Sequence, residues 1–217
     1  MKLVKKFSIT FAFAVITVTV FSYFFWYKPK FTFHEKNKPF IYKEKKEDAS
    51  TILRLKEKAA YIVSYAKANS CNSIYCFLVD MKISSGEKRF FVYNLQKDSI
   101  ELAGLVAHGS GLSGKDEIQF SNKISSNCTS LGKYKIGKPY MGKFGLAYKL
   151  YGLDNTNSNA FNRFVVLHSH SCVPNEEVAP LSICQSWGCP TVAPAFLDKL
   201  KYYIDKSNQP VLLSIYY

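Results

Sequence analysis

The chain opens with a basic cluster followed by a long uncharged hydrophobic segment. Lys2, Lys5 and Lys6 precede residues 7–27, a run of 21 residues without a charged side chain. A helix needs about 20 apolar residues to cross a bilayer, and basic residues before it favour a cytoplasmic N-terminus. Cleavable signal peptides have shorter apolar cores and a small-residue cleavage site, whereas this run ends in aromatic residues. We expect residues 1–6 to be cytoplasmic and residues 7–27 to be a transmembrane anchor or uncleaved signal, with a cleaved signal peptide as the alternative.

The pattern then changes twice before the main domain. Residues 28–48 are rich in lysine and lack apolar periodicity, so they predict a tether. Over residues 49–70 an amphipathic helix is predicted, because apolar residues recur at helical spacing. These residues are Ile52, Leu55, Ala59, Ile62, Val63 and Ala66. We expect the folded domain to cover residues 71–217.

Within residues 71–217 the dominant pattern is that of short β-strands. Runs of β-branched and aromatic residues are separated by turn signals such as Ser84-Ser85-Gly86 and Lys97-Asp98. The predicted strands are Cys76–Lys82, Arg89–Leu95, Ile100–Ala107, Leu146–Leu150, Arg163–His170 and Val211–Tyr217. One helix is predicted from Ala195 to Asp205, after Pro194. The fold class is therefore mainly β with a few helices, preceded by one N-terminal transmembrane helix.

The composition adds a strong positive charge to this picture. The net charge is +13, and 47% of the 217 residues are hydrophobic, which is enough for a packed core. A basic chain usually has an anionic partner, but no nucleic-acid-binding signature is visible, so no nucleic acid is expected. Many lysines lie beside the hydrophobic segment, where anionic lipid head groups account for them. We expect an exported protein, anchored in the membrane and facing the periplasm or cell wall.

Six cysteines fit an oxidising compartment outside the cytoplasm. If Cys189 remains a thiol, at most two disulfides can form among the other five cysteines. Cys71–Cys76 and Cys172–Cys184 are the pairings to test first, and buried free thiols are the alternative.

Two segments carry the residues that could perform chemistry. They are Phe164-Val-Val-Leu-His168-Ser169-His170 and Ser186-Trp187-Gly188-Cys189-Pro190. Alternate side chains of a strand share a face, so Phe164, His168 and His170 are predicted to point the same way. A cysteine after Gly188 lies where the backbone can turn sharply and its N–H groups can face an oxyanion. Thiolate and imidazole suffice for acyl transfer, although four histidines and six cysteines allow many chance pairs, which leaves a structural role open.

Three ordered elements resemble a known family. Ser186-x-Gly188-Cys189, downstream of His168-Ser169, is similar to the active-site signature of the L,D-transpeptidase catalytic (YkuD-like) family. Ser130-Leu-Gly-Lys-Tyr-Lys-Ile136 is similar to the segment that precedes the catalytic strand in that family. Together with residues 120–126, these elements look closest to the murein L,D-transpeptidase branch. The resemblance covers roughly Ile74 to Tyr217 and implies an L,D-transpeptidase-type β-sandwich.

The resemblance also implies roles and a reaction. Cys189 would be the nucleophile, His168 the base, the carbonyl of Ser169 a support for that base, and the backbone around Gly188 an oxyanion hole. The enzyme would be a peptidoglycan L,D-transpeptidase that forms a thioester with a tetrapeptide stem, releases D-alanine and transfers the stem to an amine. Water as the acceptor would make it an L,D-carboxypeptidase. The family needs no metal or organic cofactor.

Other residues are candidates for substrate contact, and two other functions remain open. The candidate contacts are Ser186, Trp187, His170, Tyr140 and His108, each of which could instead be an ordinary packed residue. Pro190 and Thr191 replace a hydrophobic-Arg pair that often follows the cysteine in the family. The first alternative is a zinc-dependent peptidoglycan hydrolase built on His168-Ser-His170, which would need His108 or Cys172 as a further ligand. The second is a non-catalytic wall-binding module. The sequence carries no signal for an oligomeric state.

Overall fold

The computed structural model describes residues 15–27, 48–111 and 118–217, which belong to two compact units, Met1–Ile41 and Tyr42–Tyr217. In the first unit, residues 15–22 are α-helical and continue into the π-helix η1 (Tyr23–Tyr27). Among the described residues, no helix has both the length and the apolar character needed to cross a membrane. The predicted basic cluster at residues 1–6, residues 7–14 of the predicted anchor, and residues 28–47 of the predicted tether lie outside the described residues.

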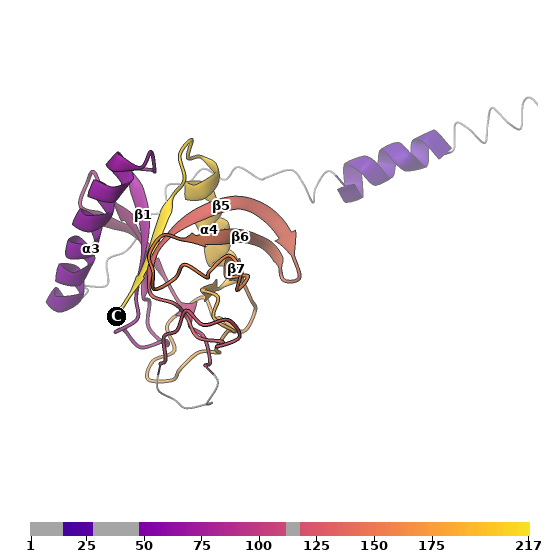
Figure 1. Cartoon of the computed structure of the whole chain (residues 1–217). Coiled ribbons are helices and arrows are strands. Elements are labelled where there is room, and N and C mark those ends of the chain that lie inside the picture. The colour runs from indigo at the N-terminus through magenta and orange to yellow at the C-terminus, as the bar shows by residue number, and fades with distance from the viewer. Residues whose placement is uncertain (1–14, 28–47, 112–117) are drawn as a thin grey trace, which may run out of the picture. The chain divides into compact units, whose positions relative to one another are not determined.

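One nine-stranded sheet organises the second unit (Figure 1). Its strands lie in the spatial order β3, β2, β1, β9, β5, β6, β7, β8 and β4. Two neighbouring pairs are parallel, β1 with β9 and β7 with β8, and the other pairs are antiparallel. The bounds are β1 Tyr75–Asp80, β2 Phe90–Asn94, β3 Ser99–Gly104, β4 Val106–Ala107, β5 Gly132–Gly142, β6 Gly145–Gly152, β7 Val166–Ser169, β8 Thr191–Val192 and β9 Leu212–Tyr216.

The strands β1, β2 and β9 bury both faces, which explains their nearly continuous hydrophobic sequences. In β1, Phe77 belongs to the main core, whereas Leu78 belongs to a second cluster beneath helix α3 (Ala49–Ala68). From the helix, Leu55 and Ile62 are fully buried in that second cluster. The helix predicted over residues 49–70 therefore exists, but it packs on the sheet as part of the domain instead of preceding it.

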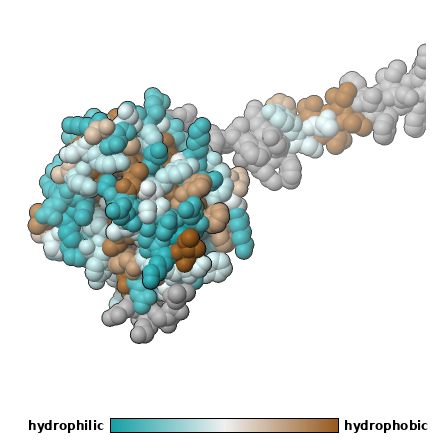
Figure 2. Space-filling model, viewed as in Figure 1, coloured by the Kyte–Doolittle hydropathy of each residue, from teal (hydrophilic) through white to brown (hydrophobic). Residues whose placement is uncertain are grey.

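The main core draws side chains from both ends of the sheet. Phe90 from β2, Tyr148 from β6 and Val192 from β8 all lie in it, so the sheet must curve around this core in two layers. Helix α4 (Pro194–Asp205) closes the core, with the ring of Phe196 edge-on to that of Phe90 at 5.4 Å. On the face seen in Figure 2, hydrophilic side chains cover most of this unit and hydrophobic ones form small separate patches. The prediction of a mainly β domain with few helices is confirmed.

Two predicted strands differ from the structure, and one strand was not predicted. The predicted strand Ile100–Ala107 is divided into β3 and β4, because the ladder breaks at Leu105. The predicted strand Arg163–His170 is shorter: Phe164 has a φ of 56° and is 84% exposed, so the chain turns before β7 begins. Phe164 therefore does not share a strand face with His168. Strand β5 was not predicted, because its glycines and Pro139 interrupt the alternation of apolar and polar residues that is typical of a strand.

The described cysteines comprise one disulfide and four thiols. Cys172 and Cys184 are joined, with their Cα atoms 6.0 Å apart, which confirms that pairing. The pairing of Cys71 with Cys76 is wrong, because both are free and buried in the cluster beneath α3. Cys76 is fixed within β1, and the thiol of Cys71 donates to the carbonyl of Asn69 at 3.5 Å instead.

Candidate active site

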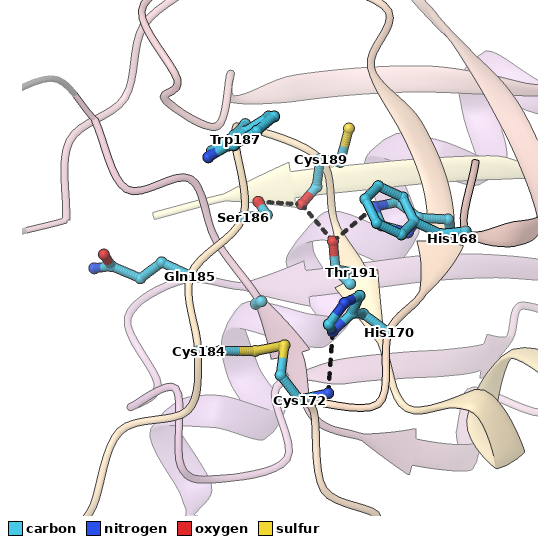
Figure 3. A pocket seen from close by; sticks show the side chains of 11 residues that line it. His168, His170, Cys172, Cys184, Gln185, Ser186, Trp187, Cys189 and Thr191 are labelled. Atoms are coloured by element: carbon cyan, nitrogen blue, oxygen red, sulfur yellow. Dashed lines mark hydrogen bonds between the residues drawn. A yellow bond between two sulfur atoms is a disulfide. The ribbon is translucent and has the colours of Figure 1, made fainter. Parts of the chain in front are cut away.

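A pocket of about 210 Å³ lies beside the parallel strands β7 and β8 and collects most of the predicted site (Figure 3). The predicted residues that line it are His168, His170, Ser186, Trp187 and Cys189. Phe144 and Thr191, which were not predicted as site residues, also line it, as does the Cys172–Cys184 disulfide. The disulfide thus ties the segment after His170 to the loop that leads to Cys189.

The Ser-x-Gly-Cys segment is a tight turn that positions the cysteine. The Ser186 hydroxyl donates to the carbonyl of Cys189 at 2.6 Å and accepts the N–H of Gly188 at 3.2 Å. Gly188 has a φ of 106°, and a Cβ there would lie 2.7 Å from the carbonyl oxygen of Cys128. Only glycine fits this position.

The same turn changes the predicted oxyanion hole. Because the N–H of Gly188 donates to Ser186, it is not free to bind an oxyanion in this arrangement. Within the described ranges, the N–H groups of Trp187 and Cys189 have no protein acceptor. Those two groups are therefore the available donors, and the role of Gly188 is conformational.

The sulfur of Cys189 lies against the start of β7. It accepts the N–H of Val166 at 3.5 Å and lies 3.8 Å from the carbonyl oxygen of Phe164, to which a thiol can donate. Burial raises the pKa of the Cys189 thiol, while the Val166 N–H and the charge of Arg163 oppose that rise. A neutral thiol satisfies both backbone contacts, whereas a thiolate would face the Phe164 carbonyl without a proton to share.

The imidazole of His168 is held in one tautomer. Its Nδ1 lies 3.1 Å from the carbonyl oxygen of Ser169, which can only accept, so Nδ1 carries the proton. The predicted support by Ser169 is therefore present. Burial lowers the pKa of His168, although the bond to Ser169 opposes this shift. In the neutral ring, Nε2 is unprotonated and can act as a base.

Thr191 links the histidine to the cysteine backbone. Its hydroxyl oxygen lies 3.0 Å from Nε2 of His168 and 3.3 Å from the carbonyl oxygen of Cys189 (Figure 3). Among the described residues, no hydrogen bond joins the Cys189 sulfur to the His168 ring. The two groups share one pocket as a neutral thiol and a neutral base, not as a preformed ion pair. Catalytic contacts are often loose without substrate.

Comparison with known proteins identifies the domain. The sequence model described as the L,D-transpeptidase catalytic domain matches residues 46–214. The chain belongs to this family. The match begins upstream of the resemblance seen in the sequence and takes in helix α3, as its packing on the sheet requires.

Solved structures that resemble this L,D-transpeptidase domain do so at low sequence identity. The Ldtfm-avibactam carbamoyl enzyme is 11% identical with a TM-score of 0.41, covering 66% of this chain and 49% of that one. An L,D-transpeptidase from Xylanimonas cellulosilytica DSM 15894 is 12% identical with a TM-score of 0.38, covering 65% and 60%. The helical cell shape determining protein Pgp2 from Campylobacter jejuni is 12% identical with a TM-score of 0.40, covering 74% and 55%. The chain thus spans 49% to 60% of the length of these structures. No curated protein matches the chain.

Arg163 is a residue of this L,D-transpeptidase site that sequence reasoning missed. Its guanidinium lies close to the Ser186–Cys189 turn, where a Cβ on Gly188 would be 3.2 Å from Nη2. It donates to the carbonyls of Ser121 and Cys128 and to the hydroxyls of Ser126 and Ser130. Arg163 therefore ties together residues 121–130, and the carbonyl of Cys128 in that segment lies against Gly188. Nothing in the local sequence around Arg163 signals this long-range role.

Phe144 is a second missed residue. It lies at the tip of the β5–β6 hairpin, and its ring stacks on His168 at 5.2 Å and meets His170 edge-on at 5.5 Å. The hairpin therefore covers the histidine side of the pocket. Tyr140, a predicted contact, lies in β5 and lines a separate groove.

His108 does not line the pocket. Its Nδ1 accepts from the buried guanidinium of Arg89 at 2.9 Å, and burial together with that charge lowers the pKa of His108 to about 4. Its carbonyl accepts the N–H of Ser186 at 2.8 Å, so His108 supports the loop that leads to Cys189. His108 was predicted as a candidate for substrate contact, but burial and the bond to Arg89 hold its ring outside the pocket.

The zinc alternative lacks the further ligands that it needs. Cys172 is bound to Cys184, and Nδ1 of His108 accepts from Arg89. In the part of the chain that the structure describes, no group of three or more His, Cys, Asp or Glu side chains is arranged to hold a metal.

The neutral thiol–imidazole pair predicts the pH dependence of Cys189 alkylation. Because burial raises the pKa of the thiol, the iodoacetamide rate at the Cys189 peptide, followed by mass spectrometry, should rise with pH only above the range of an ordinary cysteine. The Cys189→Ala variant gives the background from the buried thiols. A rate that is already maximal at neutral pH would show a resting thiolate–imidazolium pair instead.

The hydroxyl of Thr191 predicts a measurable stability effect. Because Nε2 of His168 is unprotonated, the single proton of the Thr191 hydroxyl is donated to it, while the Cys189 carbonyl keeps the Ser186 hydroxyl as a donor. Thr191→Val leaves Nε2 without this buried partner, so the free energy of unfolding in urea should fall by about 1–3 kcal/mol. Thr191→Ser keeps the hydroxyl and should retain most of the stability. Equal stability of the valine variant and the native protein would contradict the link.

Proposed function

We propose that this chain is a peptidoglycan L,D-transpeptidase with Cys189 as its nucleophile and His168 as its base. The proposal rests on one observation: an unbridged, half-buried cysteine and a histidine with a fixed tautomer line the same pocket. Membership of the L,D-transpeptidase catalytic domain family supports the reaction class. Both the thiol and the imidazole are uncharged before substrate binds, so proton transfer accompanies attack.

The first half-reaction forms a thioester. The Cys189 sulfur turns away from β7, Nε2 of His168 takes the thiol proton, and the sulfur attacks the carbonyl that joins the diamino acid to D-alanine. The N–H groups of Trp187 and Cys189 stabilise the oxyanion. His168 then returns the proton to the leaving amine, the C–N bond breaks, and D-alanine departs.

The second half-reaction releases the stem from the enzyme. A side-chain amine of a neighbouring stem attacks the thioester and gives its proton to His168, which returns that proton to the departing Cys189 thiolate. This forms a cross-link and restores the neutral pair. Water follows the same route and yields a shortened stem, so the choice of acceptor decides between transpeptidase and carboxypeptidase activity.

The test is incubation with a defined tetrapeptide stem and an amine acceptor. The native protein should release D-alanine and carry a stem adduct on the Cys189 peptide in mass spectrometry. Cys189→Ala should lower the release at least about 1,000-fold, as loss of a nucleophile does, while Cys71→Ala, which removes a buried thiol outside the pocket, should not. D-alanine release that survives in Cys189→Ala and stops with a chelator would favour the zinc hydrolase. Stem binding without any product would favour the wall-binding module.

We further propose that the protein is exported and anchored in the membrane by its N-terminal segment. Apolar side chains of residues 15–25 are exposed, and a helix with such a surface needs an apolar environment; they include Val15, Ile16, Val18, Val20, Phe21, Phe24 and Phe25. The Cys172–Cys184 disulfide suits an oxidising compartment. Cell fractionation should recover the full-length chain with the membranes after a high-salt wash. A mature N-terminus beyond Lys28, found by terminal sequencing, would instead show a cleaved signal peptide.

A further inference from the structure

A lysine lies on the strand next to the catalytic cysteine. Lys149 of β6 pairs directly with Val166 of β7, and the N–H of Val166 contacts the Cys189 sulfur. Directly paired residues in an antiparallel ladder present their side chains on the same face. The side chains of Lys149 and Val166 therefore share a face of the sheet.

The catalytic histidine shares this face with Tyr140. His168 pairs with Ala147, and Ala147 pairs with Tyr140 on the far side of β6. Ala147 and Lys149 are two residues apart in one strand, so their side chains point to the same side of the sheet. The pair of Lys149 and Val166 therefore lies on the same side as Tyr140, Ala147 and His168. One continuous surface thus leads from the pocket across β6 to β5, whose ribbons run side by side in Figure 1.

The ammonium group of Lys149 is held between two aromatic rings. Its Nζ lies 5.2 Å from the ring centre of Phe161 and 5.8 Å from that of Tyr140, distances typical of cation–π contacts. Both rings are partly open to solvent, with exposures of 48% and 38%. Lys149 forms no ion pair with any residue that the structure describes, so its charge has no carboxylate partner among them.

The surface continues into a basic groove of about 910 Å³. Lys135 lies 5.7 Å from the ring centre of Tyr151, which in turn stacks on Phe161 at 5.3 Å. The acidic residue lining this groove is Asp205, which is bound to Lys201 and to the hydroxyl of Tyr148. The groove lysines are Lys135, Lys138 and Lys149, so the surface favours an anion with apolar parts.

We propose that Lys149, seated between Tyr140 and Phe161, binds a side-chain carboxylate of the stem peptide whose acyl group is transferred to Cys189. This inference rests on the proposed function, and it assigns a specificity site to the donor stem. Lysine binds carboxylate as a point charge, and the two rings offer apolar area to the alkyl parts of the stem. A stem whose side-chain carboxylates are amidated would lose the contact with the charge of Lys149 and keep the apolar contacts with the rings of Tyr140 and Phe161.

The experiment compares two tetrapeptide stems, one with free side-chain carboxylates and one with those groups amidated. With the full-length protein, Lys149→Met should raise the KM for the free stem about tenfold, the loss expected for one charged hydrogen bond, without changing kcat. The KM for the amidated stem should not change. Lys149→Arg should recover most of the loss, and Lys97→Met, on the distant β2–β3 turn, should have no effect on either stem.

A second measurement separates failure of this inference from failure of the proposed function. Calorimetric binding of both stems to Cys189→Ala, with and without Lys149→Met, reports on the subsite even if no D-alanine is released. A loss of affinity on Lys149→Met that is confined to the free stem supports the carboxylate site. Equal losses of affinity for both stems would assign Lys149 a structural role and contradict the proposal, and unchanged affinity for both stems would overturn it.

Discussion

The close approach of the Ser186–Cys189 turn to the Cys128 carbonyl leaves no room for a side chain at Gly188, and the site is built around that contact. Arg163 donates a hydrogen bond to the same carbonyl, that of Cys128, at 2.5 Å. One charged side chain thus fixes the backbone segment that Gly188 contacts. Ser186 closes the turn from within by bonding its own backbone neighbours. The position of the Cys189 sulfur is therefore set by backbone geometry and by its backbone contacts at Phe164 and Val166, and not by a hydrogen bond to His168.

This geometry has a chemical consequence. Sulfur and imidazole are both buried enough to favour their neutral forms, and the nearby charge of Arg163 only partly offsets the cost of ionising the thiol. In the proposed reaction, the thiol becomes nucleophilic only when its proton moves to His168. A thiolate would be open to oxidation, whereas a neutral thiol reacts slowly with oxidants.

The sequence predicted what depends on local pattern and on ordered motifs. Helix α3, helix α4 and most strands follow from the spacing of apolar residues, and the pocket contains Cys189 and His168 as the motifs indicated. The missed features depend on contacts between distant segments. Arg163 binds a loop more than 30 residues upstream at Ser130, and Phe144 reaches His168 only because β6 pairs with β7 and carries the hairpin tip beside it.

Strand β5 and His108 show two further reasons why pattern alone is insufficient. The second half of β5 is exposed, so hydrophobic alternation does not mark it as a strand. His108 stands at a strand end beside a glycine, the context in which the sequence predicted a site residue, but its Nδ1 accepts a hydrogen bond from the buried Arg89. The identity of a partner across the fold, and not the residue type, decides which histidine lines the pocket.

The place of β9 in the sheet bears on how the protein is made. This strand follows all the others in the described chain, yet it lies between β1 and β5 and joins the two halves of the sheet (Figure 1). Until it has been synthesised, neither half can complete its ladder, and pairing over so long a sequence separation is slow. An incomplete chain that lacks β9 therefore has two half-sheets with unpaired strand edges at β1 and β5.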